Sequence, residues 1–214
     1  MRRARANVGA TTMHGPIDTA ASTTSIAVDE GPNCTRPPPV GASAATRAAS
    51  ALAAAAVERF GAIDAVFANA GFGGPGGFTG SDPDHWRDMV LTNVYGAALT
   101  VRATLDHLRS SKGHLLLTGS VAGRRAIPGS LYSCTKWAVT AMGEAVRTEV
   151  AGSGMRVTLI EPGIVATPFW DDGHGPIEHP LQEDDVARAV IWALGQPPHV
   201  DVNEILIRPT GQAG

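Results

Sequence analysis

The sequence predicts an α/β fold with a doubly wound parallel sheet, and two patterns carry this prediction. From about residue 44 onward, segments of helical composition alternate with short apolar runs of strand length. The apolar runs are nearly continuous, as expected for strands that are covered by helices on both faces. With 214 residues, the chain can form one such domain around a core of ordinary size.

Four helices and four strands are predicted in alternation. The helices cover residues 44–60, 82–110, 130–151 and 183–194. Gly61 and Gly152 end the first and third of these helices, and Asp82 caps the second, which has Pro83 in its first turn. The strands are expected at residues 64–68, 115–118, 157–160 and 205–207.

Residues 1–43 do not continue this alternation. They contain Pro37-Pro38-Pro39 among scattered Thr, Ser, Gly and Arg, and no stretch has a clear period of 2 or 3.6 residues. The chain therefore divides into an irregular segment at residues 1–43, expected to be poorly ordered or non-native, and a folded part at residues 44–214. The sheet is expected to be incomplete on its N-terminal side.

Composition excludes several classes of partner. The formal net charge of −3 gives no reason to expect binding to nucleic acid or to an anionic membrane. No apolar stretch approaches the 18 residues or so of a membrane-spanning helix, and the charged N-terminus is not followed by the apolar region of a secretory signal. Cys34 and Cys134 are isolated and lack metal-ligand spacing. A cytoplasmic protein is the simplest interpretation.

Tyr132 and Lys136 form the most informative pair in the chain. Their i, i+4 spacing places both side chains on one face of a predicted helix. A tyrosine acts as a general acid or base near neutral pH only if its phenolate is stabilised, and a neighbouring ammonium can supply that stabilisation. Lowering the pKa by about 3 units would take roughly 4 kcal/mol. The alternative is an ordinary exposed pair on a helix.

Four further pieces occur with this pair in an order that resembles the short-chain dehydrogenase/reductase family. They are Asn69-Ala70-Gly71 after the first strand, Asn93 in the second helix, Ser120 after the second strand, and Pro162-Gly163 with Thr167 after the third. The resemblance covers about residues 48–210. It implies a Rossmann-like fold that lacks its N-terminal part, and an NAD(P)-dependent oxidoreductase that interconverts an alcohol and a carbonyl compound. It also implies a homodimer or homotetramer.

The resemblance implies catalytic roles for Asn93, Ser120, Tyr132 and Lys136. Tyr132 would exchange a proton with the substrate oxygen, which Ser120 would orient. Lys136 would lower the pKa of Tyr132 and bind the nicotinamide ribose. Asn93 would hold a water that links Lys136 to solvent, and its alternative role is helix packing.

The implied cofactor is NADP or NAD, with NADP slightly favoured. Contacts to it are expected from Tyr132 and Lys136, and from residues at the strand ends: Asn69, Ala70, Gly71, Pro162, Gly163, Ile164 and Thr167. The first three of these would line the adenosine side, although the same residues could form a plain turn from strand to loop. Ile164 and Thr167 would contact the nicotinamide carboxamide.

A glycine-rich phosphate turn, which the family carries near its N-terminus, has no clear counterpart here. Gly9 and Gly15 could be its outer glycines, but Met13 stands where the middle glycine belongs. This difference predicts poor binding of NAD(P)H and leaves two alternatives to an active enzyme. The chain could be a cofactor-deficient, inactive remnant that persists as a dimerising or interaction protein. Residues 1–43 could also come from a wrong start or a shifted reading frame.

Three other groups of residues are candidates for weaker reasons. Five acidic and imidazole side chains that could ligate a metal lie close together in the sequence: Asp171, Asp172, His174, Glu178 and His179. In the family this segment is a mobile lid over the substrate, so no metal is expected. Arg124 and Arg125 could contact an acidic substrate or form a surface pair. Phe72, Phe169 and Trp170 could form pocket walls or belong to the core.

Overall fold

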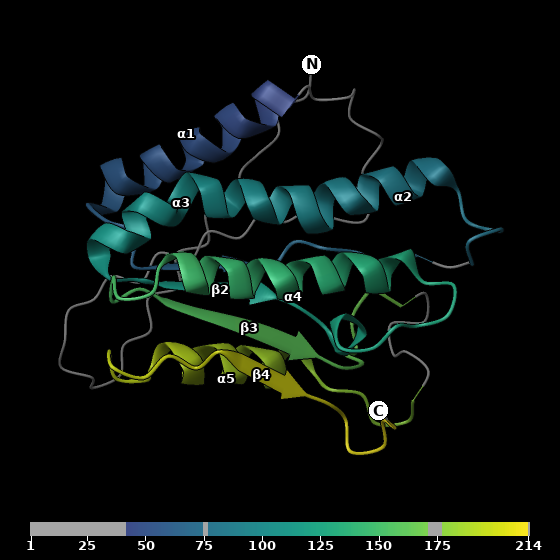
Figure 1. Cartoon of the computed structure of the whole chain (residues 1–214). Coiled ribbons are helices and arrows are strands. Elements are labelled where there is room, and N and C mark those ends of the chain that lie inside the picture. The colour runs from purple at the N-terminus through teal and green to yellow at the C-terminus, as the bar shows by residue number, and fades with distance from the viewer. Residues whose placement is uncertain (1–41, 75–76, 171–176, 214) are drawn as a thin grey trace.

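The computed structural model describes residues 42–74, 77–170 and 177–213 (Figure 1). The helical elements are α1 (Ala42–Phe60), α2 (Pro83–Val90), the π-helical turn η1 (Leu91–Gly96), α3 (Ala97–Ser111), the short 3-10 helix η2 (Val121–Gly123), α4 (Leu131–Glu149) and α5 (Glu183–Leu194). The strands are β1 (Ala65–Ala68), β2 (His114–Thr118), β3 (Arg156–Pro162) and β4 (Glu204–Ile207). The predicted alternation of helix and strand is confirmed.

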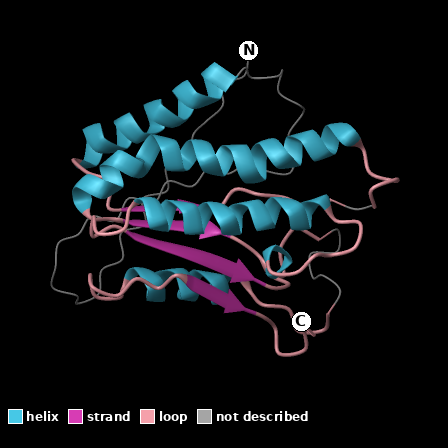
Figure 2. Ribbon diagram, in the orientation of Figure 1, coloured by secondary structure: helices cyan, strands magenta, loops and turns pink. Residues whose placement is uncertain are grey.

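The four strands form one parallel sheet in the order β1-β2-β3-β4 (Figure 2). Leu115 of β2 lies between Val66 of β1 and Val157 of β3, and Ile160 lies beside Ile205 of β4. Each parallel neighbour is reached through a helical crossover, as this pairing requires. Strand β1 forms one edge of the described sheet. Of the irregular segment predicted at residues 1–43, all but the last two residues lie outside the described residues, and α1 begins at Ala42.

The two faces of the sheet bury separate sets of side chains, because successive residues of a strand point to opposite faces. On one face, residues of β1, β2 and β3 pack against α1, α3 and α4, and the largest of them are Leu115, Leu117 and Leu159. On the other face, Leu116 and Ile160 pack against Val190 and Ala193 of α5. Figure 1 shows the corresponding layers, with α4 and α3 on one side of the sheet and α5 on the other. This is the doubly wound arrangement that the sequence predicts.

The helix boundaries follow the predicted signals, with one difference. Asp82 accepts a hydrogen bond from the backbone N–H of Asp84 at 3.0 Å with Pro83 in the first turn, and Gly61 follows α1 with a φ of +87°. The helix predicted as continuous over residues 82–110 contains the π-helical turn η1, which carries Asn93. Such turns insert one residue into the helix and often occur at functional sites. No helix in the described part of the chain is long and apolar enough to cross a membrane.

His114, the first residue of β2, is a buried and uncharged imidazole. Its Nε2 lies 2.7 Å from Thr158 Oγ1, and the Thr158 hydroxyl donates to the carbonyl of Val202 at 2.6 Å, so Nε2 carries the proton and donates it. Burial, and next the positive charge of Arg156, lower the pKa of His114 to about 3.

This lowered pKa makes His114 one contributor to the acid dependence of stability. Between about pH 6.5 and pH 3 the unfolded chain binds a proton at His114 that the folded chain does not, so stability falls as the pH falls, by up to ~1.4 kcal/mol per pH unit. We expect His114→Gln to flatten this dependence, and urea unfolding at pH 7 and pH 5 measures it. His199→Gln, at an exposed position, should keep the wild-type slope. Equal slopes for all three proteins would contradict the prediction.

Candidate functional site

The predicted site residues come together at the carboxyl edge of the parallel sheet. Asn69 follows β1, Ser120 follows β2, and Pro162 ends β3. Tyr132 and Lys136 lie in the first turns of α4, which begins at the same edge. Carboxyl ends of parallel strands are where open α/β sheets bind their ligands, so the location agrees with a binding or catalytic site.

The hydroxyl groups of Ser120 and Tyr132 lie close enough to interact. Ser120 is buried, and its Oγ accepts from the backbone N–H of Ala122 at 3.0 Å, which fixes the side chain at the start of η2. Tyr132 is half-buried. Burial raises the pKa of Tyr132 to about 12, and the hydrogen bond with Ser120 opposes part of that rise. At neutral pH the Tyr132 hydroxyl is therefore protonated and can donate.

Lys136 lies beneath this pair. Its side chain is buried, its Nζ donates to the carbonyl of Thr118 at 2.8 Å, and Nζ lies 5.6 Å from the centroid of the Tyr132 ring. Burial lowers the pKa of Lys136 to about 8. The sequence correctly places the two side chains on one helix face. The role of Lys136 in lowering the pKa of Tyr132 stays a prediction: in this structure the ammonium donates to the Thr118 carbonyl, and burial is the largest cause of both shifts.

Asn93 joins three segments of the site. Its side chain is 1% exposed, and its Oδ1 accepts from the backbone N–H of Phe72 at 2.9 Å. Its Nδ2 donates to the Phe72 carbonyl at 2.8 Å and to Thr135 Oγ1 at 3.0 Å. The π-helical turn η1 thus places the Asn93 amide between the loop after β1 and α4, the helix that carries Tyr132, and it bonds to both. These contacts exceed plain helix packing, and the water-holding role remains a prediction.

The loop after β1 approaches Lys136 closely. Asn69 is exposed, and its Oδ1 accepts from the Thr118 hydroxyl at 2.7 Å. Gly71 lies so close to two side chains of the site that a larger residue would crowd them, because a Cβ there would lie 3.1 Å from Asn93 Oδ1 and 3.4 Å from Lys136 Nζ. Ala70 and Gly71 are themselves exposed. The segment therefore forms an open, narrow edge beside the buried ammonium.

The segment after β3 is held by the C-terminal part of the chain. The backbone N–H of Gly163 donates to the Ile207 carbonyl at 2.7 Å, and the N–H of Ile164 donates to Gln212 Oε1 at 2.9 Å. A Cβ at Gly163 would overlap the Gln212 side-chain oxygen, so a larger residue here would displace Gln212 from its bond to Ile164. Thr167 Oγ1 accepts from the N–H of Phe169 at 3.3 Å.

An ion-pair cluster that the sequence did not reveal joins the same segments. Glu161, next to Pro162, is fully buried, and both of its carboxylate oxygens accept from Arg124 Nε, at 2.7 and 2.8 Å. Thr140 Oγ1 donates to Glu161 at 3.3 Å, and Arg124 also pairs with Glu204 on β4. A Cβ at Gly119 would lie 2.8 Å from Glu161 Cγ, so the residue before Ser120 packs directly on this side chain.

One feature of the sequence points to this ion-pair cluster once the structure is known. Glu161 is the one acidic residue within the apolar run of β3, and a charged side chain in a buried strand requires a partner. The partner is the arginine four residues after Ser120 in the chain. The partnership itself spans 37 residues, which no local pattern reports.

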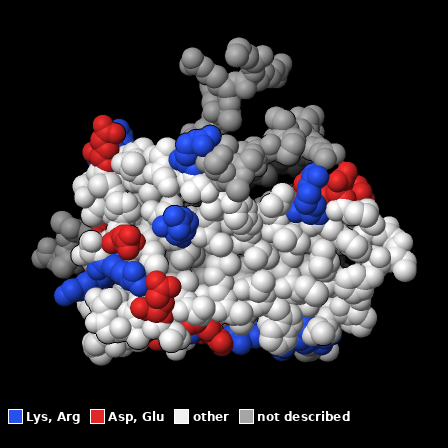
Figure 3. All heavy atoms as spheres, turned by 45° about the horizontal axis from the view of Figure 1, so that its top comes forward, with Lys and Arg blue, Asp and Glu red and all other residues white. Residues whose placement is uncertain are grey.

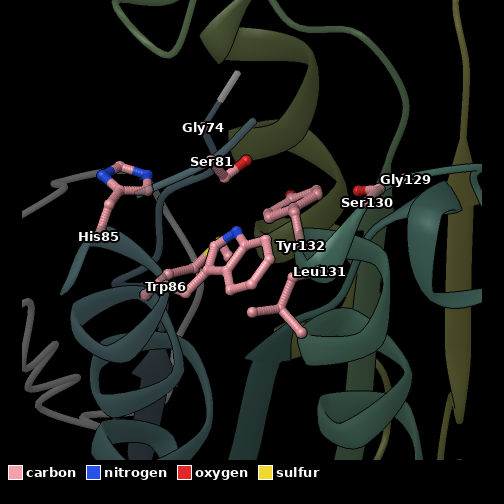
Figure 4. Close-up of a pocket in the computed structure, with 9 residues that line it drawn as sticks. Gly74, Ser81, His85, Trp86, Gly129, Ser130, Leu131 and Tyr132 are labelled. Atoms are coloured by element: carbon pink, nitrogen blue, oxygen red, sulfur yellow. The ribbon is translucent and has the colours of Figure 1, made fainter. Parts of the chain in front are cut away.

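Aromatic side chains surround Tyr132. Phe169 packs against Tyr132 with ring centroids 5.4 Å apart, and Trp170 packs against Phe169 at 5.3 Å. Figure 4 shows Trp86 of α2 beside Tyr132 and Leu131 of α4, in a hollow between the two helix starts. The hollow has a volume of about 10 Å³, enough for about one water molecule. Of the predicted pocket walls, Phe169 therefore lies beside Tyr132, and Trp170 packs against Phe169.

The candidate metal ligands are not assembled into a site among the described residues. Asp171, Asp172 and His174 lie outside the described residues, and Glu178 and His179 are exposed. Over residues 42–74, 77–170 and 177–213, no group of three or more His, Cys, Asp or Glu is placed to hold a metal ion.

Comparison with known proteins decides the family. The sequence profile described as short chain dehydrogenase matches residues 40–174. This chain belongs to the short-chain dehydrogenase family. An uncharacterised oxidoreductase of Staphylococcus saprophyticus is 38% identical over 154 residues, which cover 71% of this chain and 66% of that protein. A second oxidoreductase of the same organism is 34% identical over 77% of this chain and 72% of its own length. The chain thus matches about two thirds of the length of these relatives.

Solved structures of the short-chain dehydrogenase family share the fold. An alcohol dehydrogenase from the archaeon Thermococcus sibiricus, complexed with 5-hydroxy-NADP, is 30% identical with a TM-score of 0.71 over 79% of this chain and 72% of that chain. A closed form of serine dehydrogenase complexed with NADP+ is 28% identical with a TM-score of 0.73 over 79% of this chain and 74% of that chain. The sheet is therefore Rossmann-like.

The residues at this edge of the sheet suit the nicotinamide half of an NAD(P) cofactor. Gly71 and Gly163 are closely surrounded, since an added Cβ would lie 3.1 Å from Asn93 Oδ1 and 3.1 Å from Pro209 Cδ respectively, and they follow β1 and β3 at the edge that holds Lys136 and Ser120. Donors and acceptors converge there from three strand ends. The predicted phosphate turn at Gly9 and Gly15 lies outside the described residues, so the fit concerns the nicotinamide side alone.

The Glu161 cluster yields a prediction that separates site geometry from stability. We expect Glu161→Gln, which removes the charge and keeps the shape, to lower kcat about 10–100-fold and the free energy of unfolding by about 2–3 kcal/mol. Steady-state kinetics and urea unfolding measure both.

Arg147→Met is a matched control for this variant. Arg147 also ties β3 to its surroundings, by donating to the carbonyls of Val157 at 3.2 Å and Asn203 at 2.9 Å, but at the other end of the strand. A similar loss of stability with kcat within about twofold of wild type is expected there. Equal losses of kcat in the two variants would show that Glu161 acts only through stability.

Proposed function

We propose that the chain is an NAD(P)-dependent oxidoreductase that interconverts an alcohol and a carbonyl compound, with Tyr132 as the group that exchanges the proton. The observation that carries this proposal is the hydroxyl pair of Tyr132 and Ser120 at the carboxyl edge of the sheet, with the buried Lys136 ammonium beneath it. Two hydroxyl groups that meet in this way can both contact one substrate oxygen.

Each side chain of the site has a task in this reaction. Ser120, fixed by the N–H of Ala122, orients the substrate oxygen. Tyr132 gives its proton to that oxygen during reduction and takes it back during oxidation. Lys136 holds a positive charge near the Tyr132 ring, and Asn93 positions the loop after β1 against α4. Phe169 shields the Tyr132 ring from water on one side.

A nicotinamide cofactor is proposed as the redox partner of this site. When bound, it supplies or accepts the hydride. The residues that would hold it are Asn69, Ala70, Gly71, Tyr132, Lys136, Pro162, Gly163, Ile164 and Thr167. NADP is favoured because the similar alcohol dehydrogenase and serine dehydrogenase structures are complexes with NADP+ or a derivative of it. Those two names also support a small alcohol or hydroxy compound as substrate.

Self-association through α2, η1 and α4 is proposed as well, as a homodimer or homotetramer. Val90, Leu91 and Trp137 on these elements are large apolar side chains that are 38%, 47% and 46% exposed. Figure 3 shows that the charged side chains of the face covered by α1 to α4 lie mainly toward its margins, which leaves a broad uncharged area. An inactive member of the family that acts only through such contacts is the competing function.

The competing functions differ in cofactor binding and in the need for Tyr132. The missing phosphate turn predicts poor binding of NADPH, whereas an active enzyme must bind it and show fluorescence transfer from the tryptophans of the chain to NADPH. For the active enzyme we expect Tyr132→Phe to lower kcat at least about 10³-fold because the proton donor is removed. Tyr95→Phe, which changes the other tyrosine, should keep kcat within about twofold. Absence of NADPH and NADH binding would favour the inactive member, and a Tyr132→Phe variant within about tenfold of wild type would exclude Tyr132 as the proton donor.

The lowered pKa of Lys136 predicts the pH dependence of reduction. The ammonium that faces Tyr132 is lost as the pH rises through about 8, so kcat/KM for carbonyl reduction should be level below that pH and fall above it. In Lys136→Arg the side chain keeps its positive charge above pH 8, so the fall of kcat/KM at high pH should disappear. The value of kcat/KM itself should be lower than in the wild type at all pH values. A wild-type profile that stays level from about pH 7 to 9.5 would contradict the prediction.

A further inference from the structure

The two neighbouring arginines after Ser120 have different surroundings. Arg124 is engaged by Glu161 and Glu204. Arg125 is exposed and forms no ion pair or side-chain hydrogen bond with any residue that the structure describes. A charged side chain next to a proposed active site, without a partner among the described residues, is a candidate for binding a ligand.

The backbone of Arg125 is nevertheless held firmly, and by the helix that carries Tyr132. Ser133 is buried, and its hydroxyl lies 3.0 Å from the Arg125 carbonyl and 2.7 Å from the Ala122 carbonyl. The same oxygen accepts from the N–H of Ile127 at 3.4 Å. The loop that carries Arg125 is therefore held by Ser133, which follows Tyr132 directly in α4.

Arg125 lines a cavity whose other walls are mostly apolar. The cavity has a volume of about 250 Å³, and its lining includes Val121, Ile127, Ile164, Ile177 and Gln212. Val121 follows Ser120 and Ile164 lies two residues after Pro162, and Ser120 Oγ donates to the Pro162 carbonyl at 3.5 Å, so these two lining segments meet at the proposed site. Arg125 is the one charged side chain among the described residues that line it.

We propose that this cavity binds the carboxylate of the substrate through Arg125, so that the substrate is a small hydroxy acid or oxo acid. The inference rests on the proposed function and names its substrate class. One guanidinium matches one carboxylate, with two parallel hydrogen bonds, and the apolar walls accept the short carbon chain. The volume lies just below the ~300–1,000 Å³ of pockets for drug-sized ligands, which suits a compound of a few carbons. A phosphate dianion would call for more donors than this lining offers.

Chemical modification tests the site without any turnover. Phenylglyoxal reacts with accessible arginines, and peptide mass spectrometry reports each position separately. With 3-hydroxybutanoate at about ten times its Kd, modification of Arg125 should slow about tenfold, while its methyl ester at the same concentration should have no effect. Arg102, an exposed arginine on α3, is the internal control and should react at the same rate throughout. Equal modification of Arg125 with acid and ester would overturn the proposal.

Kinetics on the same two compounds give the second arm. We expect the wild-type chain to prefer the acid over the ester about 10–100-fold in kcat/KM for oxidation, and Arg125→Met to bring that ratio close to 1. Arg125→Lys should retain part of the preference, and Arg102→Met should retain all of it. Turnover without preference for the acid would overturn the carboxylate site and leave the proposed reaction standing. Protection of Arg125 without turnover of either compound would support the carboxylate site and overturn the reaction.

Discussion

The geometry of the site depends on one buried carboxylate, that of Glu161. It lies at the end of β3 and contacts the segment before Ser120, the arginine after it, and the helix that carries Tyr132 and Lys136. A carboxylate this deeply buried costs several kcal/mol of desolvation unless it is paired. The bonds from Arg124 and Thr140 offset that cost only when the three segments keep their relative positions. The ion pair therefore acts on position more than on overall stability.

The two-residue period of the strand explains how this carboxylate reaches the helix. Val157 and Leu159 point to the face covered by α4, and Glu161 continues the same row one step closer to the site. Gly143 lets α4 approach Leu159, since a Cβ there would lie 2.9 Å from Leu159 Cγ. On α4, Thr140 lies one turn beyond Lys136 and meets Glu161. Packing in the core and the position of the ammonium are thus set by the same helix–strand contact.

Sequence patterns predicted the features that depend on local spacing. The alternation of helices and strands, the cap at Asp82 and the gathering of strand-end residues at one edge of the sheet follow from periodicity and from parallel topology. The π-helical turn around Asn93 was not predictable, because one inserted residue changes a helical period too little to be seen. The link between Glu161 and Arg124 was also missed, because it is set by which loop lies over the end of β3. Spacing likewise gave the contact of Tyr132 with Lys136 but not their burial, which sets both pKa values.

Burial shifts the pKa values of Tyr132 and Lys136 toward their neutral forms, and this bears on how each direction of the proposed reaction would begin. The pKa of Tyr132 is raised to about 12 and that of Lys136 is lowered to about 8. A phenol of this pKa holds its proton at neutral pH, so Tyr132 is ready to donate to a carbonyl oxygen. Forming its phenolate would cost roughly 3 kcal/mol more than for a free tyrosine. In the proposed reaction, reduction would start from the resting protonation state, whereas oxidation of an alcohol would require additional stabilisation of the phenolate, and the Lys136 ammonium lies 5.6 Å from the ring centroid.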